Sequence, residues 1–332
     1  MINTIYYEKH LIDHERASKI LSKFSKARLI EIDRFGEVFN KRDQNFRLQK
    51  QNPALILAEK YDNFVLKAPV GFGIGVAKNF YFSHMYNCIY DCRYCFLQGL
   101  YASANYVLFV NFEDFDKKIE DIIHENKTEK TAFFSGYDCD SLALENITGF
   151  VKHTLPLFRN YPNSLLEIRT KSVQLNPLLS TIPFDNCVVA YSLMPDLMSK
   201  ALDDKAPPVK ARIDAMVKLS SHGWKLGFRF DPLIHGENWK YLYGDLIDRL
   251  FENISPNSVH SVSFGTLRFP KKMFKKMQKL RPQEKAFVTL QAEGKNNVSY
   301  KEELQLEMIE FCKSVMRNYV KSDILFDYMS EY

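Results

Sequence analysis

The sequence predicts an α/β protein built around a parallel sheet, and two observations carry this prediction. Short β-branched or aromatic runs bounded by turn formers alternate with amphipathic helical runs through the middle of the chain. Six such strand–helix units follow one another, which favours a parallel sheet that is either barrel-like or doubly wound. The expected strands are residues 79–84, 131–135, 164–170, 187–192, 225–230 and 259–265.

Three helices between or after these strands have clear signals. Residues 112–126 place five apolar side chains on one stripe, and residues 208–223 open with Pro208 and close with Gly223. Residues 270–280 put apolar side chains on one face and five lysines on the other, which is typical of a solvated amphipathic helix. These helices fit the crossover pattern of the expected sheet.

Composition sets the domain organisation and the compartment. The chain has 332 residues, 46% of them hydrophobic, and a net charge of +5, which permits an anionic partner without requiring one. We expect an N-terminal α/β extension at 1–78, a core at 79–281 and a C-terminal hairpin and helix extension at 282–332. The mixed-charge N-terminus and the absence of a long apolar run predict a cytoplasmic protein without a membrane segment.

Half of the six cysteines lie in one short stretch, "NCIYDCRYCFLQ", as Cys88, Cys92 and Cys95. A zinc site usually needs four ligands, often as two Cys-x2-Cys pairs, and only one such pair is present. Accidental clustering of free core thiols accounts less well for three cysteines within eight positions. A [4Fe–4S] cluster held by three thiolates leaves one iron open to bind a small molecule. The loop follows the first expected strand, at the end of a barrel where chemistry occurs.

A Cys-x3-Cys-x2-Cys loop after the first strand of a six-unit β/α core resembles the radical S-adenosylmethionine superfamily. The resemblance implies a partial (β/α)6 barrel of the TIM type, a [4Fe–4S] cluster and S-adenosylmethionine as cosubstrate. It also implies that the reduced cluster cleaves the cosubstrate into methionine and a 5′-deoxyadenosyl radical. Tyr94 occupies the family's usual aromatic position beside the adenine.

A closer resemblance is to the spore photoproduct lyase family. The third cysteine is followed by an aromatic residue, Leu and Gln in "CRYCFLQ", and further stretches fit the same family in order. They are "VNFEDF" (110–115), "CDSLALENITGFVKHTL" (139–155), "IRTKSVQLNPLL" (168–179), "YSLMPDL" (191–197), "GFRFDPLIHGENWKYLYGDLIDRL" (227–250) and "LRFPKKMFKKM" (267–277). The similarity spans nearly the whole chain and is strongest at the cysteine loop.

This resemblance implies repair of a methylene-bridged thymine dimer in DNA, with flavodoxin or ferredoxin as external reductant. Two other functions remain open on the residues. One is a radical enzyme of the same architecture that acts on a modified RNA base, a peptide or a metabolite. The other is a non-catalytic metal-binding module that contacts nucleic acid through a basic face.

The resemblance also assigns cosubstrate-binding residues. Lys171 matches the family lysine that holds the cosubstrate carboxylate, and Ser192 matches a serine at the next strand end. Asp140 and Ser141 lie just past the second strand, where the family contacts the methionyl amine or ribose. Without the resemblance, either of them would cap a helix over 142–155.

Three departures from the family concern hydrogen return and DNA binding. Phe96 stands where the repair enzyme has a tyrosine, and Tyr137 stands where it has a hydrogen-donor cysteine. Cys139 follows two residues later, so in an extended strand end it would share a face with Tyr137 and reach similar space. The stretch 284–303 replaces a basic, aromatic hairpin with a shorter and more acidic one, whose hairpin signal is centred on Gly294.

Three further charged residues have two possible roles. Asp231 and Arg268 lie just past expected strands, where they could line a site or form a structural salt bridge. Arg229 lies within a strand and could point to either side.

Overall fold

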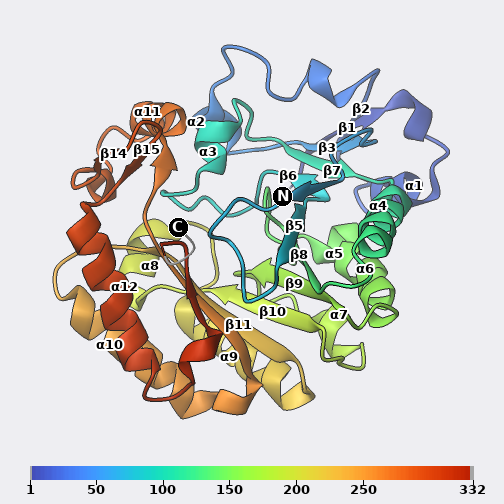
Figure 1. Ribbon diagram of the computed structural model, residues 1–332. Coiled ribbons are helices and arrows are strands. Elements are labelled where there is room, and N and C mark those ends of the chain that lie inside the picture. The colour runs from blue at the N-terminus through green and yellow to red at the C-terminus, as the bar shows by residue number, and fades with distance from the viewer. Residues whose placement is uncertain (1, 330–332) are drawn as a thin grey trace.

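The computed structural model describes residues 2–329, and its centre is an eight-stranded, curled sheet (Figure 1). Six consecutive strands are parallel and lie side by side in chain order, as β5-β8-β9-β10-β11-β12. A doubly wound sheet would reverse its strand order at a switch point, and this sheet does not. The predicted partial β/α barrel is therefore confirmed. Antiparallel β4 and parallel β16 extend its two edges.

The predicted core strands are confirmed, three of them to the residue. They are β5 (Lys78–Phe82), β8 (Thr131–Ser135), β9 (Ser164–Thr170), β10 (Cys187–Ser192), β11 (Lys225–Leu233) and β12 (Val259–Thr266), with β4 (Val65–Lys67) and β16 (Leu325–Asp327) at the edges. The first strand ends at Phe82, two residues before the prediction, because the chain then leaves for a second sheet.

The helices that connect the parallel strands of the large sheet lie mostly on its outside (Figure 1). The helices of the described residues are α1 (Glu15–Ser22), α2 (Phe46–Gln49), α3 (Leu97–Leu100), α4 (Phe112–Glu125), α5 (Glu145–Thr148), α6 (Phe150–Arg159), α7 (Asn176–Leu179), α8 (Asp196–Leu202), α9 (Val209–His222), α10 (Trp239–Asn253), α11 (Lys271–Leu280) and α12 (Glu302–Met316). The expected single helix over 142–155 is wrong. Gly149 adopts a left-handed φ of 64° and divides the segment into α5 and α6.

A second, five-stranded sheet has the order β2-β1-β3-β7-β6. Its strands are β1 (Thr4–Glu8), β2 (Arg28–Ile32), β3 (Leu55–Ala58), β6 (Met85–Tyr86) and β7 (Tyr106–Phe109). The strands thus cross the expected boundary at residue 78 in both directions, since β4 joins the barrel and β6 and β7 complete the N-terminal sheet. The C-terminal region carries the expected hairpin, β14 (Gln291–Glu293) and β15 (Asn297–Ser299), beside β13 (Phe269–Pro270).

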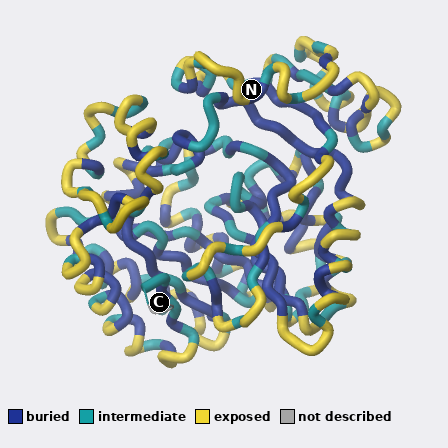
Figure 2. Tube along the Cα trace, turned by 45° about the horizontal axis from the view of Figure 1, so that its top comes forward, coloured by how far each residue is buried: buried dark blue, intermediate teal, exposed yellow. Residues whose placement is uncertain are grey.

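Burial follows the sheets. Buried residues run along the central strands, and exposed residues concentrate on peripheral helices and loops (Figure 2). The five lysines of α11 are exposed while Phe274 and Met277 are buried, as the helical pattern predicts. Within residues 2–329, no helix combines the length and the apolar character that crossing a membrane requires.

Candidate active site

The cysteine loop begins where β6 leaves the second sheet. Asn87 takes a left-handed φ of 66°, and its side-chain amide donates to the carbonyls of Ser103 and Asn105 at 2.8 Å each. Asparagine adopts this conformation more readily than most residues, and here its two side-chain bonds to a distant segment hold the turn. The turn sends Cys88 and the following residues across the end of the barrel.

The three loop thiols are free and lie on one loop, with Cys92 buried and Cys88 and Cys95 half-buried. The backbone N–H of Tyr90 bonds the Cys88 sulfur, and that of Leu97 bonds the Cys95 sulfur. Burial raises the pKa of the Cys88 thiol to about 12, so a bound metal must displace its proton. Within residues 2–329, no three His, Cys, Asp or Glu side chains converge tightly enough for a single metal ion. Three thiols on one loop fit a cluster, whose cysteines bind different irons, better than a zinc ion, which usually needs four ligands.

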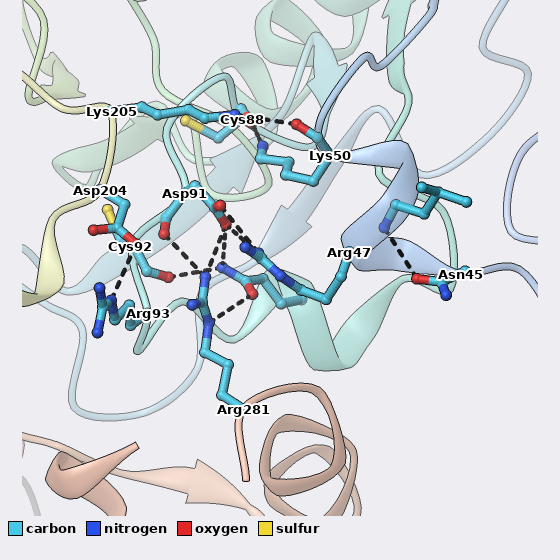
Figure 3. Close-up of polar contacts among 12 residues, drawn as sticks. Asn45, Arg47, Lys50, Cys88, Asp91, Cys92, Arg93, Asp204, Lys205 and Arg281 are labelled. Carbon is cyan, nitrogen blue, oxygen red and sulfur yellow. Dashed lines mark hydrogen bonds and ion pairs between the residues drawn. The ribbon is translucent and has the colours of Figure 1, made fainter. Parts of the chain in front are cut away.

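A polar network around Asp91 holds this loop (Figure 3). Arg47 Nη1 donates to both carboxylate oxygens of Asp91 at 2.8 and 3.0 Å, and Arg281 Nη2 donates to Oδ1 at 2.9 Å. The amide of Gln98 donates to Asp91 Oδ1 at 3.1 Å and to the Cys92 carbonyl at 2.8 Å. The N-terminal extension, through Arg47, and the last residue of the expected core, Arg281, therefore both hold the loop. The resemblance named the cysteines but not Asp91, although it lies between two of them.

A second buried network fixes Tyr94. Its hydroxyl donates to Asp203, which also forms a 2.7 Å ion pair with Arg212. Burial alone would raise the pKa of Asp203, but the charges of Lys171 and Arg212 outweigh it and lower the pKa. The Asp203 carboxylate is thus kept ionised, and its hydrogen bond holds the side chain of Tyr94, which belongs to the cysteine loop. Sequence reasoning missed Asp203, whose only signal is its place in the loop after α8.

Lys171 lies where a cosubstrate carboxylate could reach it. Its Nζ is 5.7 Å from the Tyr94 ring centroid, and among residues 2–329 the ammonium has no hydrogen bond or ion pair. Burial alone would lower its pKa, but Cys92 and Asp203 outweigh burial and the pKa is raised. An unpaired, half-buried ammonium at a strand end suits an anionic ligand.

The other expected cosubstrate residues are engaged within the fold. Asp140 accepts from the backbone N–H groups of Leu142 and Ala143 at 3.0 and 2.9 Å, as a capping residue does. It also accepts from Thr170 and from the backbone of Lys171. The Ser141 hydroxyl is buried and bonds Ser135 at 2.7 Å. Ser192 lies at the end of β10 and its carbonyl accepts from Arg212. Their cosubstrate roles stay predictions.

The expectation that Tyr137 and Cys139 share a face is wrong. The chain turns at Gly136, which has a φ of 77°, and Cys139 N–H donates back to the Gly136 carbonyl. Cys139 therefore points toward Met85, whose backbone N–H bonds its sulfur, and toward Cys88. Tyr137 instead packs in an aromatic group that we call the ring group, Phe72, Tyr81, Phe96 and Tyr137, with centroids 6.2, 4.3 and 5.7 Å from Tyr137.

The three remaining charged candidates form ion pairs. Arg229 points into the barrel and pairs with Glu167 at 2.6 Å, where both side chains are buried. Arg268 donates to both oxygens of Asp231 at 3.0 and 3.1 Å. Asp231 and Arg268 thus pair with each other and also line one small cavity, so both of their expected roles stay predictions.

The curled parallel sheet and the three-cysteine loop after its first strand define a partial β/α barrel of the radical S-adenosylmethionine class. The family model for spore photoproduct lyase matches residues 78–326. The chain belongs to the spore photoproduct lyase family.

Individual relatives are distant in sequence. Spore photoproduct lyase of Bacillus subtilis (strain 168) is 25% identical over 201 residues, which cover 60% of this chain and 59% of the relative. The enzyme of Clostridium acetobutylicum is 21% identical over 259 residues, which cover 76% of this chain and 75% of the relative. The match therefore spans less than two thirds of the length of the Bacillus relative.

Solved structures match almost from end to end. A spore photoproduct lyase mutant with bound AdoMet and dinucleoside spore photoproduct has a TM-score of 0.84 at 16% identity and covers 96% of both chains. Spore photoproduct lyase complexed with dinucleoside spore photoproduct has a TM-score of 0.81 at 16% identity and covers 98% of this chain and 99% of that one. These likenesses establish the fold.

Proposed function

We propose that the protein is a radical S-adenosylmethionine lyase that repairs a thymine photoproduct in DNA. The observation that carries the proposal is the buried Cys88–Cys95 loop with the unpaired ammonium of Lys171 beside it. Family membership supports the same chemistry. Relatives of the same fold bind AdoMet and dinucleoside spore photoproduct, which supports this cosubstrate and this substrate class.

The residues of the site fall into two groups, one that would hold the cluster and one that would bind the cosubstrate. Cys88, Cys92 and Cys95 would hold a [4Fe–4S] cluster, which when bound and reduced supplies the electron that cleaves S-adenosylmethionine to a 5′-deoxyadenosyl radical. Lys171 would bind the cosubstrate carboxylate, and Tyr94 would lie beside its adenine, with Asp203 holding the Tyr94 ring in place. Asp140, Ser141 and Ser192 would bound the cosubstrate at the strand ends.

Hydrogen return to the product needs a donor near the substrate. Tyr137 is our proposed donor, because it packs against Phe96 while Cys139 turns toward Cys88. Burial raises the pKa of Tyr137 to about 12, so its O–H is intact at neutral pH. A tyrosine O–H is a poorer donor than a thiol, and this step would differ from that of the repair enzyme.

Partners and compartment follow from this chemistry. Duplex DNA must expose the damaged bases to a buried site, at a cost of a few kcal/mol that is least for a lesion. An external reductant such as flavodoxin or ferredoxin would supply the electron. A reducing compartment, the cytoplasm, would keep the six free thiols reduced.

One observation favours a second candidate, a radical enzyme of the same architecture with another substrate. Tyr137 and Phe96 replace the two hydrogen-transfer residues that the family resemblance implies, and they contact each other at 5.7 Å between centroids. A different product radical would accept a different donor.

Anaerobic reconstitution followed by assay tests both candidates. We expect about four irons and four sulfides per chain, formation of 5′-deoxyadenosine, and restored thymine from a dinucleotide photoproduct. Cleavage of S-adenosylmethionine without thymine would favour the second candidate. A colourless protein that binds stoichiometric zinc would contradict both.

A further inference from the structure

The N-terminal extension places a buried lysine directly behind a cluster ligand. Lys50 caps the C-terminal end of α2, is 4% exposed, and its ammonium donates to the backbone carbonyl of Cys88 (Figure 3). An ammonium on the carbonyl of a residue lies within roughly 7 Å of the sulfur of that residue by covalent geometry. Lys50 therefore lies close to the position of a cluster iron.

Other cations surround the same loop. Lys171, the proposed carboxylate ligand, lies near Cys92 and Cys95, whereas the other cations on the side of Lys50 are compensated or exposed. Arg47 and Arg281 both pair with Asp91, which offsets part of their charge. Lys205 donates to the Lys50 carbonyl at 3.1 Å, but its side chain is exposed to solvent. Water screens an exposed charge, whereas a buried charge acts at a lower effective dielectric constant. Lys50 is thus the cation on this side of the loop with the strongest expected influence on the Cys88 sulfur.

Because the expected cluster is charged, a cation at the position of Lys50 would affect the reduction potential of the cluster. Three thiolates outweigh the charge of the oxidised [4Fe–4S] core, so the bound cluster is anionic and reduction adds a further negative charge. A fixed nearby cation stabilises the reduced form more than the oxidised form. Net charge, hydrogen bonds and solvent exposure are the factors that set the potentials of such clusters.

We propose that Lys50 is a positioning residue that raises the reduction potential of the cluster, so that a weaker reductant can start the reaction. The inference rests on the proposed cluster. Lys50 acts through Cys88 and touches neither cosubstrate nor substrate. Its hydrogen bond also orients the Cys88 ligand, which gives it a second, separable role.

A redox titration of the reconstituted protein in the absence of S-adenosylmethionine tests this inference. Electron paramagnetic resonance monitors the reduced cluster and gives its midpoint potential. Lys50→Gln keeps a donor for the Cys88 carbonyl but removes the charge, and Lys50→Arg keeps both. We expect a more negative midpoint potential in Lys50→Gln and a potential close to wild type in Lys50→Arg. Lys205→Gln is the matched control, and its potential should stay near that of the wild type.

The outcomes separate the charge from the hydrogen bond. Equal shifts in Lys50→Gln and Lys50→Arg, or equal shifts in Lys50→Gln and Lys205→Gln, would overturn the inference. An unchanged potential with reduced iron content in Lys50→Gln would leave Lys50 a purely structural residue and also overturn it. If Lys50→Gln holds no cluster, Lys50→Met replaces it under the same criteria, and loss of cluster in both makes the role structural. Failure of the wild type to bind iron would contradict the proposed function itself.

Discussion

The two sides of the barrel mouth are built from different kinds of contact. On the side of the cysteine loop, charged and polar groups fix the backbone through Asp91, and Asp203 fixes Tyr94. On the side of Tyr137, the aromatic rings of the ring group pack against one another at tilted and edge-to-face angles. Directional hydrogen bonds and ion pairs specify one geometry, whereas apolar packing tolerates substitutions of similar volume.

This difference explains where the chain departs from its family. The loop side carries the three cysteines and Lys171 that the resemblance assigns, and residues from distant segments hold the cysteine loop through Asp91. On the ring side, Phe96 and Tyr137, the departures that the family resemblance implies, pack against each other at 5.7 Å between ring centroids. Cofactor chemistry and substrate chemistry are therefore separable in this molecule, and variants on each side should fail in different ways.

The largest expected effect comes from the cysteine loop itself. Cys92→Ala should abolish cluster assembly and cleavage of S-adenosylmethionine, because a two-thiolate loop cannot retain the cluster. Cys187→Ala is the control, since Cys187 is a free, buried cysteine in β10 outside the loop. Iron and sulfide analysis, visible absorption and 5′-deoxyadenosine assay measure the effect. A full cluster in Cys92→Ala would contradict the assignment.

The next effect concerns the stability of the loop side. Asp203→Asn leaves Arg212 buried without its counter-ion, and breaking such a pair costs about 3–5 kcal/mol. The matched control is Asp204→Asn, whose pair with Arg93 is solvent-exposed and is worth about 1 kcal/mol or less. Urea unfolding of the apoprotein compares the two variants. Equal losses would contradict the difference between the buried and the exposed pair.

The same pair predicts a pH dependence. The pKa of Asp203 is lower in the folded protein than in the unfolded chain, where an aspartate has a pKa of about 3.9. Its contribution to stability is therefore fully present above about pH 4 and is lost as the pH falls through the folded value. Asp203→Asn should remove this part of the acid sensitivity, so its unfolding free energy should fall less than that of the wild type below pH 4.

A smaller effect is expected at the cosubstrate. Lys171→Ala should leave cluster absorption unchanged and weaken S-adenosylmethionine binding by about 10- to 150-fold, the equivalent of roughly 1.5–3 kcal/mol for one charge-assisted contact. Lys200→Ala on the exposed side of α8 is the control. Calorimetric titration measures both. Unchanged affinity in Lys171→Ala would place the carboxylate elsewhere.

The sequence predicted the barrel well because its strands carry local signals. The runs at 131–135, 164–170 and 187–192 match the structure to the residue, since each is a short apolar run with turn formers at its ends. Gly149 was not recognised as a helix break, although its left-handed conformation divides 142–155. The expected α/β extension at 1–78 contains only β1, β2 and β3 of the second sheet. Strands β6 and β7 join it from beyond residue 78, and pairing between distant segments leaves no local pattern.

In the candidate site, too, contacts between residues far apart in the sequence could not be predicted. The three cysteines and Lys171 follow from spacing and resemblance, but the partners that hold them come from far along the chain. Arg281 lies 190 residues from Asp91, and Lys50 lies 38 residues from Cys88. The side that Cys139 faces depends on one turn at Gly136, which a period-two pattern cannot represent.

The smallest effect on rate is expected from variants that block the return of hydrogen to the product. These variants are also the sharpest test of the role of the ring group. If Tyr137 is the donor, Tyr137→Phe should still form 5′-deoxyadenosine but release abnormal product, because the product radical is then trapped by other species. Cys139→Ala should leave the product distribution unchanged. Product analysis by chromatography and mass spectrometry measures both. The ring group should survive Tyr137→Phe, since only the hydroxyl is removed.

Three outcomes of this pair of variants decide the assignment. Abnormal product from Cys139→Ala with normal product from Tyr137→Phe would transfer the role to Cys139, despite its turn toward Cys88. Normal product from both would mean that the donor is another residue or that 5′-deoxyadenosine returns the abstracted hydrogen. Retention of the label of a C6-deuterated substrate in the thymine would identify the second case. Abnormal product from Tyr137→Phe alone would establish that the ring side has replaced a thiol donor by a tyrosine, while the loop side supplies the same radical chemistry as its relatives.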